Sequence, residues 1–67
     1  MAKLIETHYK NGQLQDIYNC VNGKKEGEYK EYHDNGQLKA ICNYTNNKKE
    51  GKHTDYYANG ELLGIFS

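Results

Sequence analysis

The sequence contains no arginine, proline or tryptophan, and its nine lysines balance nine acidic residues to give zero net charge. A neutral chain without arginine is poorly suited to bind a phosphate backbone, so we expect no nucleic-acid partner. A membrane-spanning helix needs about 20 mostly apolar residues, and no segment of the sequence meets that requirement. The first residues also lack the apolar run of a signal peptide. We therefore expect a cytoplasmic protein, and the composition does not favour a membrane location.

The chain is short and polar but rich in tyrosine. Its 67 residues, numbered 1–67, are enough for one domain, and only 36% of them are hydrophobic. A chain of this length buries only about 60% of the surface exposed by its unfolded form, so a deep core is not expected. The seven tyrosines nevertheless argue against disorder, because disordered chains have few aromatic residues.

An internal repeat organises the whole chain. The dipeptide Asn-Gly recurs at residues 11, 35 and 59, a spacing of 24, and Lys-Lys-Glu-Gly recurs at residues 24 and 48. Residues 3–26 and 27–50 are identical at ten of 24 aligned positions. The third unit, residues 51–67, is shorter and more divergent. One register kept over three copies predicts a repeat architecture.

The turn signals predict the fold class. Asn-Gly favours a two-residue type I′ hairpin turn, since both central residues need a positive φ, and further turns are expected at Asn22-Gly23 and Asn46-Asn47. Five turns separate six strands of about seven or eight residues, with a wider turn or a glycine β-bulge expected near Gly27 and Gly51. The prediction is an all-β protein: a single-layer antiparallel meander made of three stacked β-hairpin repeats of 24 residues.

The residues of the second unit resemble a known repeat family. Gly-Glu-Tyr-Lys-Glu-Tyr-His-Asp-Asn-Gly-Gln-Leu at 27–38, followed by Tyr-Thr-Asn-Asn-Lys-Lys-Glu-Gly at 44–51, is similar to the MORN repeat. More specifically, it resembles the bacterial variant found in a family often labelled antitoxins. The resemblance implies stacked β-hairpins in one elongated sheet. For eukaryotic members it also implies a link to membrane phospholipids.

Period-2 alternation predicts which side chains share a face of the sheet. We expect the row Leu14, Leu38 and Leu62 to lie on one face, together with the row Tyr18, Cys42 and Phe66. The row Ile17, Ile41 and Ile65 is expected on the other face. Both faces then carry apolar or aromatic ladders that no second layer covers.

The final strand is expected to need a partner. Residues Leu62, Leu63, Ile65 and Phe66 form an edge without charge or proline, and such an edge invites pairing with another chain. We therefore predict that this C-terminal edge strand is covered either by formation of a homodimer or by a partner.

The residues usually found in catalytic and metal sites are not arranged for that chemistry. His8, His33 and His53 each align with tyrosine in another unit, so we expect no metal site. Cys20 and Cys42 are predicted on non-adjacent strands with Cα atoms roughly 10–12 Å apart, beyond the ~7 Å limit for a disulfide, and are expected to be free thiols. No nucleophile has an evident base and orienting group. We expect no catalytic residue, no cofactor and no enzyme activity.

The favoured function is a non-enzymatic protein-protein interaction module. A small stoichiometric inhibitor fits this description, either an antitoxin-like protein, an immunity protein or a phage-encoded anti-defence protein that binds through an aromatic face or a free edge. An alternative is a membrane-surface, phospholipid-binding element acting through the lysine-rich turns at 24–25 and 48–49; another is a self-assembling scaffold element. The residues predicted to contact a protein target are Tyr29, Tyr32, Tyr56, Tyr57, Glu28, Glu31, Asp34 and Asp55.

Overall fold

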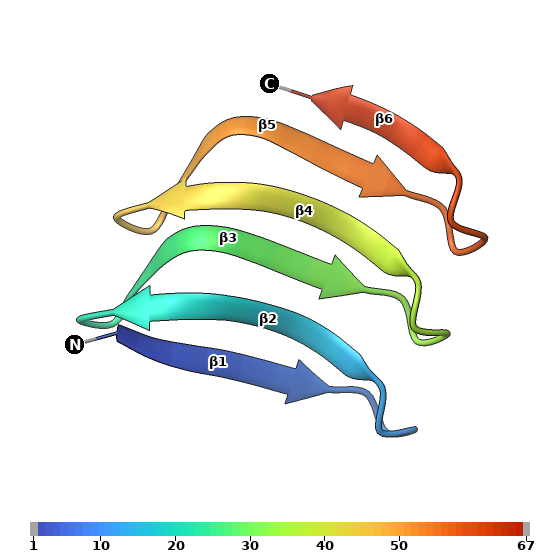
Figure 1. Ribbon diagram of the computed structural model, residues 1–67, viewed down its shortest axis with the longest axis horizontal. Helices are drawn as coiled ribbons and strands as arrows, with labels where there is room; N and C mark the ends of the chain where they lie inside the picture. Colours follow the sequence, from blue (N-terminus) through green and yellow to red (C-terminus); the bar gives the residue numbers. More distant parts are fainter. Residues whose placement is uncertain (1, 67) are drawn as a thin grey trace.

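The computed structural model describes residues 2–66 and shows six strands in one open antiparallel sheet, in the order β1-β2-β3-β4-β5-β6 (Figure 1). The strands are β1 Ala2–His8, β2 Leu14–Val21, β3 Lys24–Tyr32, β4 Leu38–Thr45, β5 Lys48–Tyr56 and β6 Leu62–Phe66. Each strand pairs with its neighbours in the chain, so the predicted all-β meander is confirmed. The molecule measures 35 × 30 × 10 Å, and its thinnest dimension equals about one sheet with its side chains.

The turns are of two kinds, and the type I′ geometry occurs at different turns from those that the sequence predicted. At Asn22-Gly23 and Asn46-Asn47 both central residues have positive φ, between 52° and 79°, as a type I′ turn requires. At residues 11–12 only Gly12 has a positive φ. The amide of Tyr9 donates to the carbonyl of Gln13, and the amide of Gly12 donates to the carbonyl of Tyr9. The Asn-Gly turns at 11, 35 and 59 are therefore three-residue loops with glycine in the left-handed region, and the expectation of type I′ geometry there was wrong.

The turns also hold successive hairpins together. The side-chain oxygen of Asn11 accepts a hydrogen bond from the amide of Gln13, and its Nδ2 donates to the carbonyl of Asp34 in the next hairpin at 2.8 Å. Asn35 repeats both bonds, with Nδ2 donating to the carbonyl of Ala58 at 2.7 Å. A second link runs beside them, because Tyr9 Oη donates to the carbonyl of Tyr32 at 2.6 Å. These bonds fix each hairpin on the following one.

β-Bulges lie at both ends of the strands. The register shifts opposite Gly27 and opposite Gly51, whose φ angles are 84° and 71°, as the sequence predicted. A second set falls near the start of each even-numbered strand, where Gln15, Lys39 and Leu63 are extra residues with no direct cross-strand partner. The sequence prediction did not include this second set.

The second set of bulges changes which side chains share a face. Directly paired residues lie on the same side of a sheet. Lys30 pairs with Ile41 and Tyr32 pairs with Leu38, and residues two apart on a strand share a face. Leu38 therefore lies with Ile41, and the same reasoning applies to the first and third hairpins. The expectation that the leucine row joins the row of Tyr18 and Cys42 was wrong, because one extra residue reverses the alternation.

We call the side bearing Ile17, Ile41 and Ile65 the isoleucine face, and the side bearing Tyr18, Tyr29 and Tyr44 the tyrosine face. Within residues 2–66, the only buried hydrophobic residues are Ala40 and Cys42, both on the tyrosine face of β4. Cys20 and Cys42 are free and lie on β2 and β4, which are not neighbours in the sheet. No helix long and apolar enough to cross a membrane occurs in the described part of the chain.

Candidate functional site

A cluster of tyrosine rings covers the first half of the tyrosine face. The rings of Tyr18 and Tyr29 stack with centroids 5.2 Å apart, and those of Tyr29 and Tyr44 are tilted at 5.4 Å. Lys25 Nζ lies 5.0–5.3 Å from all three ring centroids, within the range of a cation-π interaction. The lysine is brought there by the bulge at Gly27, which lets Lys25 pair with Cys20 and share its face. The rings are therefore already occupied by a cation of the chain itself.

The packing on this face changes the acidity of two groups. Burial raises the pKa of the Tyr29 phenol, and the nearby carboxylates of Asp16 and Glu31 raise it further because they oppose a second negative charge. Burial likewise raises the pKa of the Cys42 thiol, although the positive charges of Lys49 and Lys25 act in the opposite direction. Both groups are therefore held in their neutral forms.

A chain of polar contacts runs along the tyrosine face of β5. Lys49 Nζ lies 3.2 Å from His53 Nδ1, and His53 Nε2 lies 2.7 Å from Asp55 Oδ1. The register between β4 and β5 shifts at Cys42, which has no direct partner on β5. Both ring nitrogens of His53 are engaged, one by Lys49 and the other by Asp55. These contacts orient the imidazole on the tyrosine face.

A concave feature with a charged rim lies beside these contacts, on the tyrosine face of the second half of the sheet. It is a shallow hollow of about 330 Å³ over β3, β4 and β5. Ala40 lies at its floor, and Leu63 contributes an apolar side chain from β6. Its lining residues are Glu31, His33, Lys39, Ala40, His53, Asp55, Tyr56, Tyr57, Ala58 and Leu63.

Charged groups on the rim of the hollow are arranged in close pairs. Glu31 Oε2 lies 3.9 Å from Lys39 Nζ, and Asp55 Oδ1 lies 2.7 Å from His53 Nε2. Both carboxylates belong to one row across the sheet, because Ala40 pairs with Glu31 on one side and with Asp55 on the other. Two carboxylates therefore flank a small apolar floor, and binding pockets likewise combine an apolar lining with a few polar groups.

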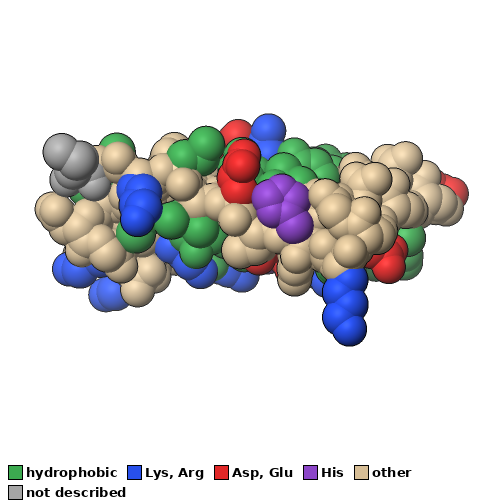
Figure 2. Space-filling view, turned by 90° about the horizontal axis from the view of Figure 1, so that it is seen from below, with side chains coloured by type: hydrophobic (Ala, Val, Ile, Leu, Met, Phe, Trp, Pro, Cys, Tyr) green, Lys and Arg blue, Asp and Glu red, His purple; other side chains and the backbone are tan. Residues whose placement is uncertain are grey.

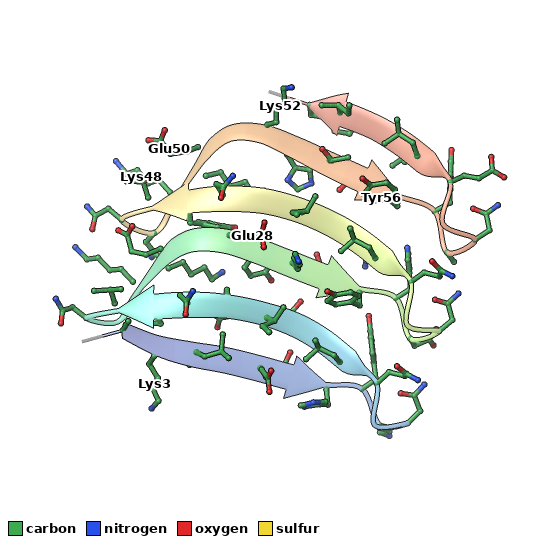
Figure 3. All side chains as sticks on the ribbon, in the orientation of Figure 1. Lys3, Glu28, Lys48, Glu50, Lys52 and Tyr56 are labelled. Atoms are coloured by element: carbon green, nitrogen blue, oxygen red, sulfur yellow. The ribbon has the colours of Figure 1, made fainter. Side chains whose placement is uncertain are left out.

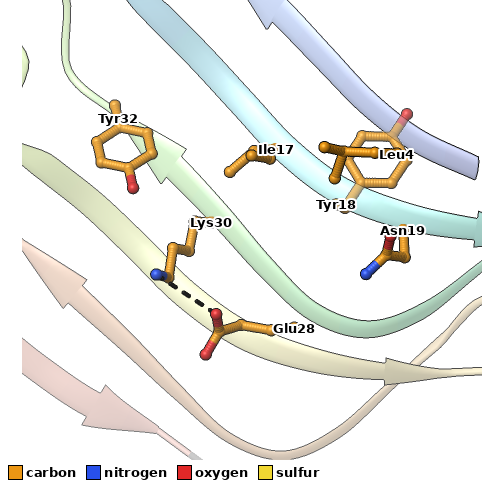
Figure 4. Close-up of a pocket in the computed structure, with 7 residues that line it drawn as sticks. All are labelled: Leu4, Ile17, Tyr18, Asn19, Glu28, Lys30 and Tyr32. Atoms are coloured by element: carbon orange, nitrogen blue, oxygen red, sulfur yellow. Dashed lines mark ion pairs between the residues drawn. The ribbon is translucent and has the colours of Figure 1, made fainter.

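A second hollow, of about 200 Å³, lies on the isoleucine face over β1, β2 and β3 (Figure 4). Lys30 and Glu28 point toward one another across it, with Nζ and Oε1 3.4 Å apart. Leu4 lines its β1 side and is 57% exposed. An exposed ion pair of this kind contributes little to stability. The lining of this hollow is more polar than that of the hollow on the tyrosine face.

The structure divides the residues predicted to contact a protein target between the two faces. Tyr29, Glu31 and Asp55 lie on the tyrosine face by their pairing, and Tyr57 lines the hollow there. Glu28 and Tyr32 lie on the isoleucine face by the same criterion. Tyr56 pairs with Leu62 on that face and also contributes to the lining of the hollow. Figure 3 labels Glu28 at the middle of β3 and Tyr56 near the end of β5.

Asp34 belongs to neither face, because it lies in the turn before β4, where its carbonyl accepts the Asn11 bond. The eight residues therefore do not form one site. The predicted edge residues Leu62, Leu63, Ile65 and Phe66 lie on β6 and are 47–56% exposed.

Six residues of the hollow were not among the predicted target contacts: His33, Lys39, Ala40, His53, Ala58 and Leu63. Of these, Leu63 was predicted only as an edge residue. Lys39 and Leu63 reach the tyrosine face as the extra residues of their bulges. His33 lies just beyond β3, and its Nε2 lies 3.0 Å from the carbonyl of Tyr56. A signal for Lys39 and Leu63 exists in the sequence, since each directly follows an aligned leucine, but the alignment alone does not reveal a bulge.

The lysine-rich turns do not present four free ammonium groups. Lys25 lies over the tyrosine rings and Lys49 contacts His53. Lys48 remains exposed beside the β4–β5 turn, with Glu50 nearby on the same strand (Figure 3). Among residues 2–66 there is also no cluster of three or more His, Cys, Asp and Glu side chains that could hold a metal ion.

The fold and its turn-to-turn bonds define a class of protein, the all-β repeat proteins built from stacked hairpins. The family model described as MORN repeat variant matches residues 25–46 and 49–67. These segments correspond to the β3–β4 and β5–β6 hairpins and make up more than half of the chain. The chain therefore belongs to the MORN repeat variant family. No curated protein and no solved structure matches it significantly.

Proposed function

We propose that this protein is a non-enzymatic binding module that acts as a small stoichiometric inhibitor of a protein target, which it contacts with its tyrosine face. The observation that carries the proposal is the hollow over β3, β4 and β5, with an apolar floor at Ala40 and carboxylates from Glu31 and Asp55 on either side. Family membership supports a binding role in general, while the choice of this face rests on the hollow.

The dimensions of the sheet are sufficient for such a contact. One face of a slab 35 Å by 30 Å offers roughly 1,000 Å², whereas each partner in a standard protein interface buries about 800 Å². Tyr57 is 53% exposed at the rim, and an exposed tyrosine beside an apolar floor is a frequent source of binding energy. A rigid sheet also loses little conformational entropy when it binds.

Two adjacent leucines provide a matched test of the face. Leu63 lines the hollow on the tyrosine face and is 47% exposed, whereas Leu62 pairs with Tyr56 on the isoleucine face and is 53% exposed. A target captured by the wild-type chain from extracts of the source cell should be lost with Leu63→Lys and retained with Leu62→Lys. Loss with Leu62→Lys alone would instead place the contact on the isoleucine face and contradict the proposal.

The inhibitory part of the proposal needs its own measurement. The captured target, once purified, should bind the 67-residue chain in a 1:1 ratio by calorimetry, and its activity should fall in proportion to the chain added until one equivalent is reached. Binding that leaves the activity of the target unchanged would retain a binding module but remove the inhibitor. Sedimentation with vesicles of anionic lipid tests the membrane-surface alternative, for which Lys25 and Lys49 are already engaged within the chain.

A further inference from the structure

The two outer strands of the sheet carry nearly all of its exposed large apolar side chains. Within residues 2–66, β1 pairs only with β2 and β6 pairs only with β5. The exposed large hydrophobic residues are Leu4, Tyr57, Leu62, Leu63, Ile65 and Phe66. Leu4 belongs to β1 and four of the others to β6, while Tyr57 lies just beyond β5. Their counterparts in the inner strands, such as Leu38, Ile41 and Cys42, are less exposed because another hairpin lies against them.

We infer that β6 of one copy pairs with β1 of a second copy, so that the chain associates head to tail and continues its own repeat. The inner junctions supply the geometry, because Ile17 pairs with Lys30 across one junction and Ile41 with Thr54 across the next. In the 24-residue repeat, Ile65 is equivalent to Ile17 and Ile41, and Glu6 is equivalent to Lys30 and Thr54. The same pairing at the new junction therefore places Ile65 opposite Glu6 of the second copy.

The neighbouring pairs follow from the same register. Gly64 lies opposite Thr7 of the second copy, and Phe66 lies opposite Ile5, on the tyrosine face. Seen from the β1 side, the molecule is a thin layer with hydrophobic side chains along the edge between charged ones (Figure 2). A strand edge with these side chains is suited to pairing with another strand.

The turn residues favour this partner over a symmetric contact between two β6 strands. At the inner junctions Tyr9 Oη and the Nδ2 atoms of Asn11 and Asn35 donate to backbone carbonyls of the following hairpin. In the third hairpin the equivalent groups are Tyr57 Oη, which has no hydrogen-bond partner within the described chain, and Asn59 Nδ2, which donates to Glu61. In the proposed contact, Tyr57 Oη meets the carbonyl of His8 in the second copy, and Asn59 Nδ2 meets the carbonyl of Lys10. An antiparallel contact between two β6 strands places the two sets of turn donors at opposite ends of the interface, away from the carbonyls of His8 and Lys10.

Head-to-tail contacts have a consequence that a closed dimer lacks. After each addition the oligomer still has one free β1 at one end and one free β6 at the other, so assembly continues beyond two copies unless a ring closes. Sedimentation velocity of the 67-residue chain over a hundredfold concentration range should show an average mass that rises past that of a dimer. A monomer at every concentration, or a mass that stops at two copies, would overturn the inference.

Charge variants at the two edges identify which strands meet. Ile65→Glu places a carboxylate opposite Glu6 of the next copy, and like charges directly opposite one another destabilise a strand pair. We expect this variant to weaken association at least tenfold. Mixing it with Glu6→Lys should restore association, because β6 of the first then meets an opposite charge on β1 of the second. The wild type mixed with Ile65→Glu is the reference, because the wild type and Glu6→Lys have the same β6. If β6 pairs with β6, Glu6→Lys and the wild type recruit labelled Ile65→Glu equally, and that result rejects the head-to-tail contact.

Two further variants separate association from folding. Tyr57→Phe removes a hydroxyl that has no partner in the monomer, so it should weaken association about two- to tenfold, the effect of one hydrogen bond. Its thermal unfolding at low concentration should match that of the wild type. Glu28→Lys, on the isoleucine face of β3 and away from both edges, is the matched control and should associate as the wild type does. Unchanged association of Tyr57→Phe would count against the contact with the carbonyl of His8.

Discussion

At the scale of single residues, the most consequential contact is the one that Lys25 makes with three tyrosine rings. An exposed lysine in a β-turn ordinarily contributes to solubility alone, but here its ammonium group lies over the aromatic cluster. The same pairing position in the third hairpin holds Lys49 against His53. The second and third hairpins therefore both place a lysine on the tyrosine face, but it contacts tyrosine rings in one and a histidine in the other.

Replacing Lys25 with methionine should remove the cation and retain most of the aliphatic chain. We expect Lys25→Met to lower the free energy of unfolding by about 1–2 kcal/mol, the contribution of a partly desolvated cation-π contact. Lys24→Met, at the neighbouring exposed position, should change it by less than about 0.5 kcal/mol. Chemical denaturation of the two variants beside the wild type measures the difference, and equal effects would mean that the ring contacts are not stabilising.

Tyr29 gives a prediction for alkaline pH. Burial and the carboxylates of Asp16 and Glu31 raise the pKa of its phenol in the folded chain above its usual value. Above about pH 10 the unfolded chain loses this proton while the folded chain keeps it. The unfolded state then binds fewer protons, and the free energy of unfolding falls as pH rises.

Tyr29→Phe removes this proton from both states. Its free energy of unfolding should therefore fall less steeply above about pH 10 than that of the wild type, when both are followed by urea denaturation at a series of pH values. The same slope in both proteins would mean that Tyr29 ionises equally in the folded and unfolded chains.

At the scale of the elements, the hairpins are joined as much by their turns as by their strands. Asn35 accepts a bond within its own turn and donates one to the next hairpin, whereas Asn59 accepts within its turn and donates only to Glu61 beside it. The two asparagines occupy equivalent positions in the repeat, so the difference between them isolates the bond between hairpins.

Asn35→Ala should destabilise the protein more than Asn59→Ala does. The expected difference is about 1 kcal/mol, because only the first variant leaves the carbonyl of Ala58 without its donor. Thermal or urea denaturation at a concentration low enough to keep the chain monomeric provides the comparison. If Asn59→Ala costs as much, the bond within the turn carries the stability and the bond between hairpins does not.

At the scale of the whole molecule, a single sheet without a covering layer depends on its inner strands. In such a one-dimensional array each hairpin is stabilised by its neighbours, so the outer strands have fewer stabilising contacts than the central ones. Within the described residues, burial is greatest at Ala40 and Cys42 on β4, consistent with that gradient.

Amide hydrogen exchange should follow the same gradient. At low protein concentration we expect the slowest exchange in β3 and β4 and the fastest in β1 and β6, because outer strands open most easily. Mass spectrometry of peptic fragments measures the order. Uniform protection across the six strands would show that the sheet opens only as one unit.

Much of this architecture could be predicted from the sequence, because the turns depend on local backbone chemistry. Glycine and asparagine at fixed intervals mark where the chain reverses, and the bulges at Gly27 and Gly51 follow from the same reasoning. The candidate site was less predictable. Tyr29, Glu31, Asp55 and Tyr57 were expected to contact a target, but the sequence did not separate them from Glu28, Tyr32 and Tyr56 on the other face.

The sequence by itself determined the 24-residue repeat, the six strands and their order, since these depend on spacing and on residues that accept a positive φ. Only the tertiary structure decided which side chains meet. One extra residue at Gln15, Lys39 or Leu63 reverses the alternation along a strand. That reversal moves the leucine row to the isoleucine face and brings Leu63 to the hollow. The physical reason is that a bulge forms through pairing between strands, and the local sequence of one strand does not contain that information.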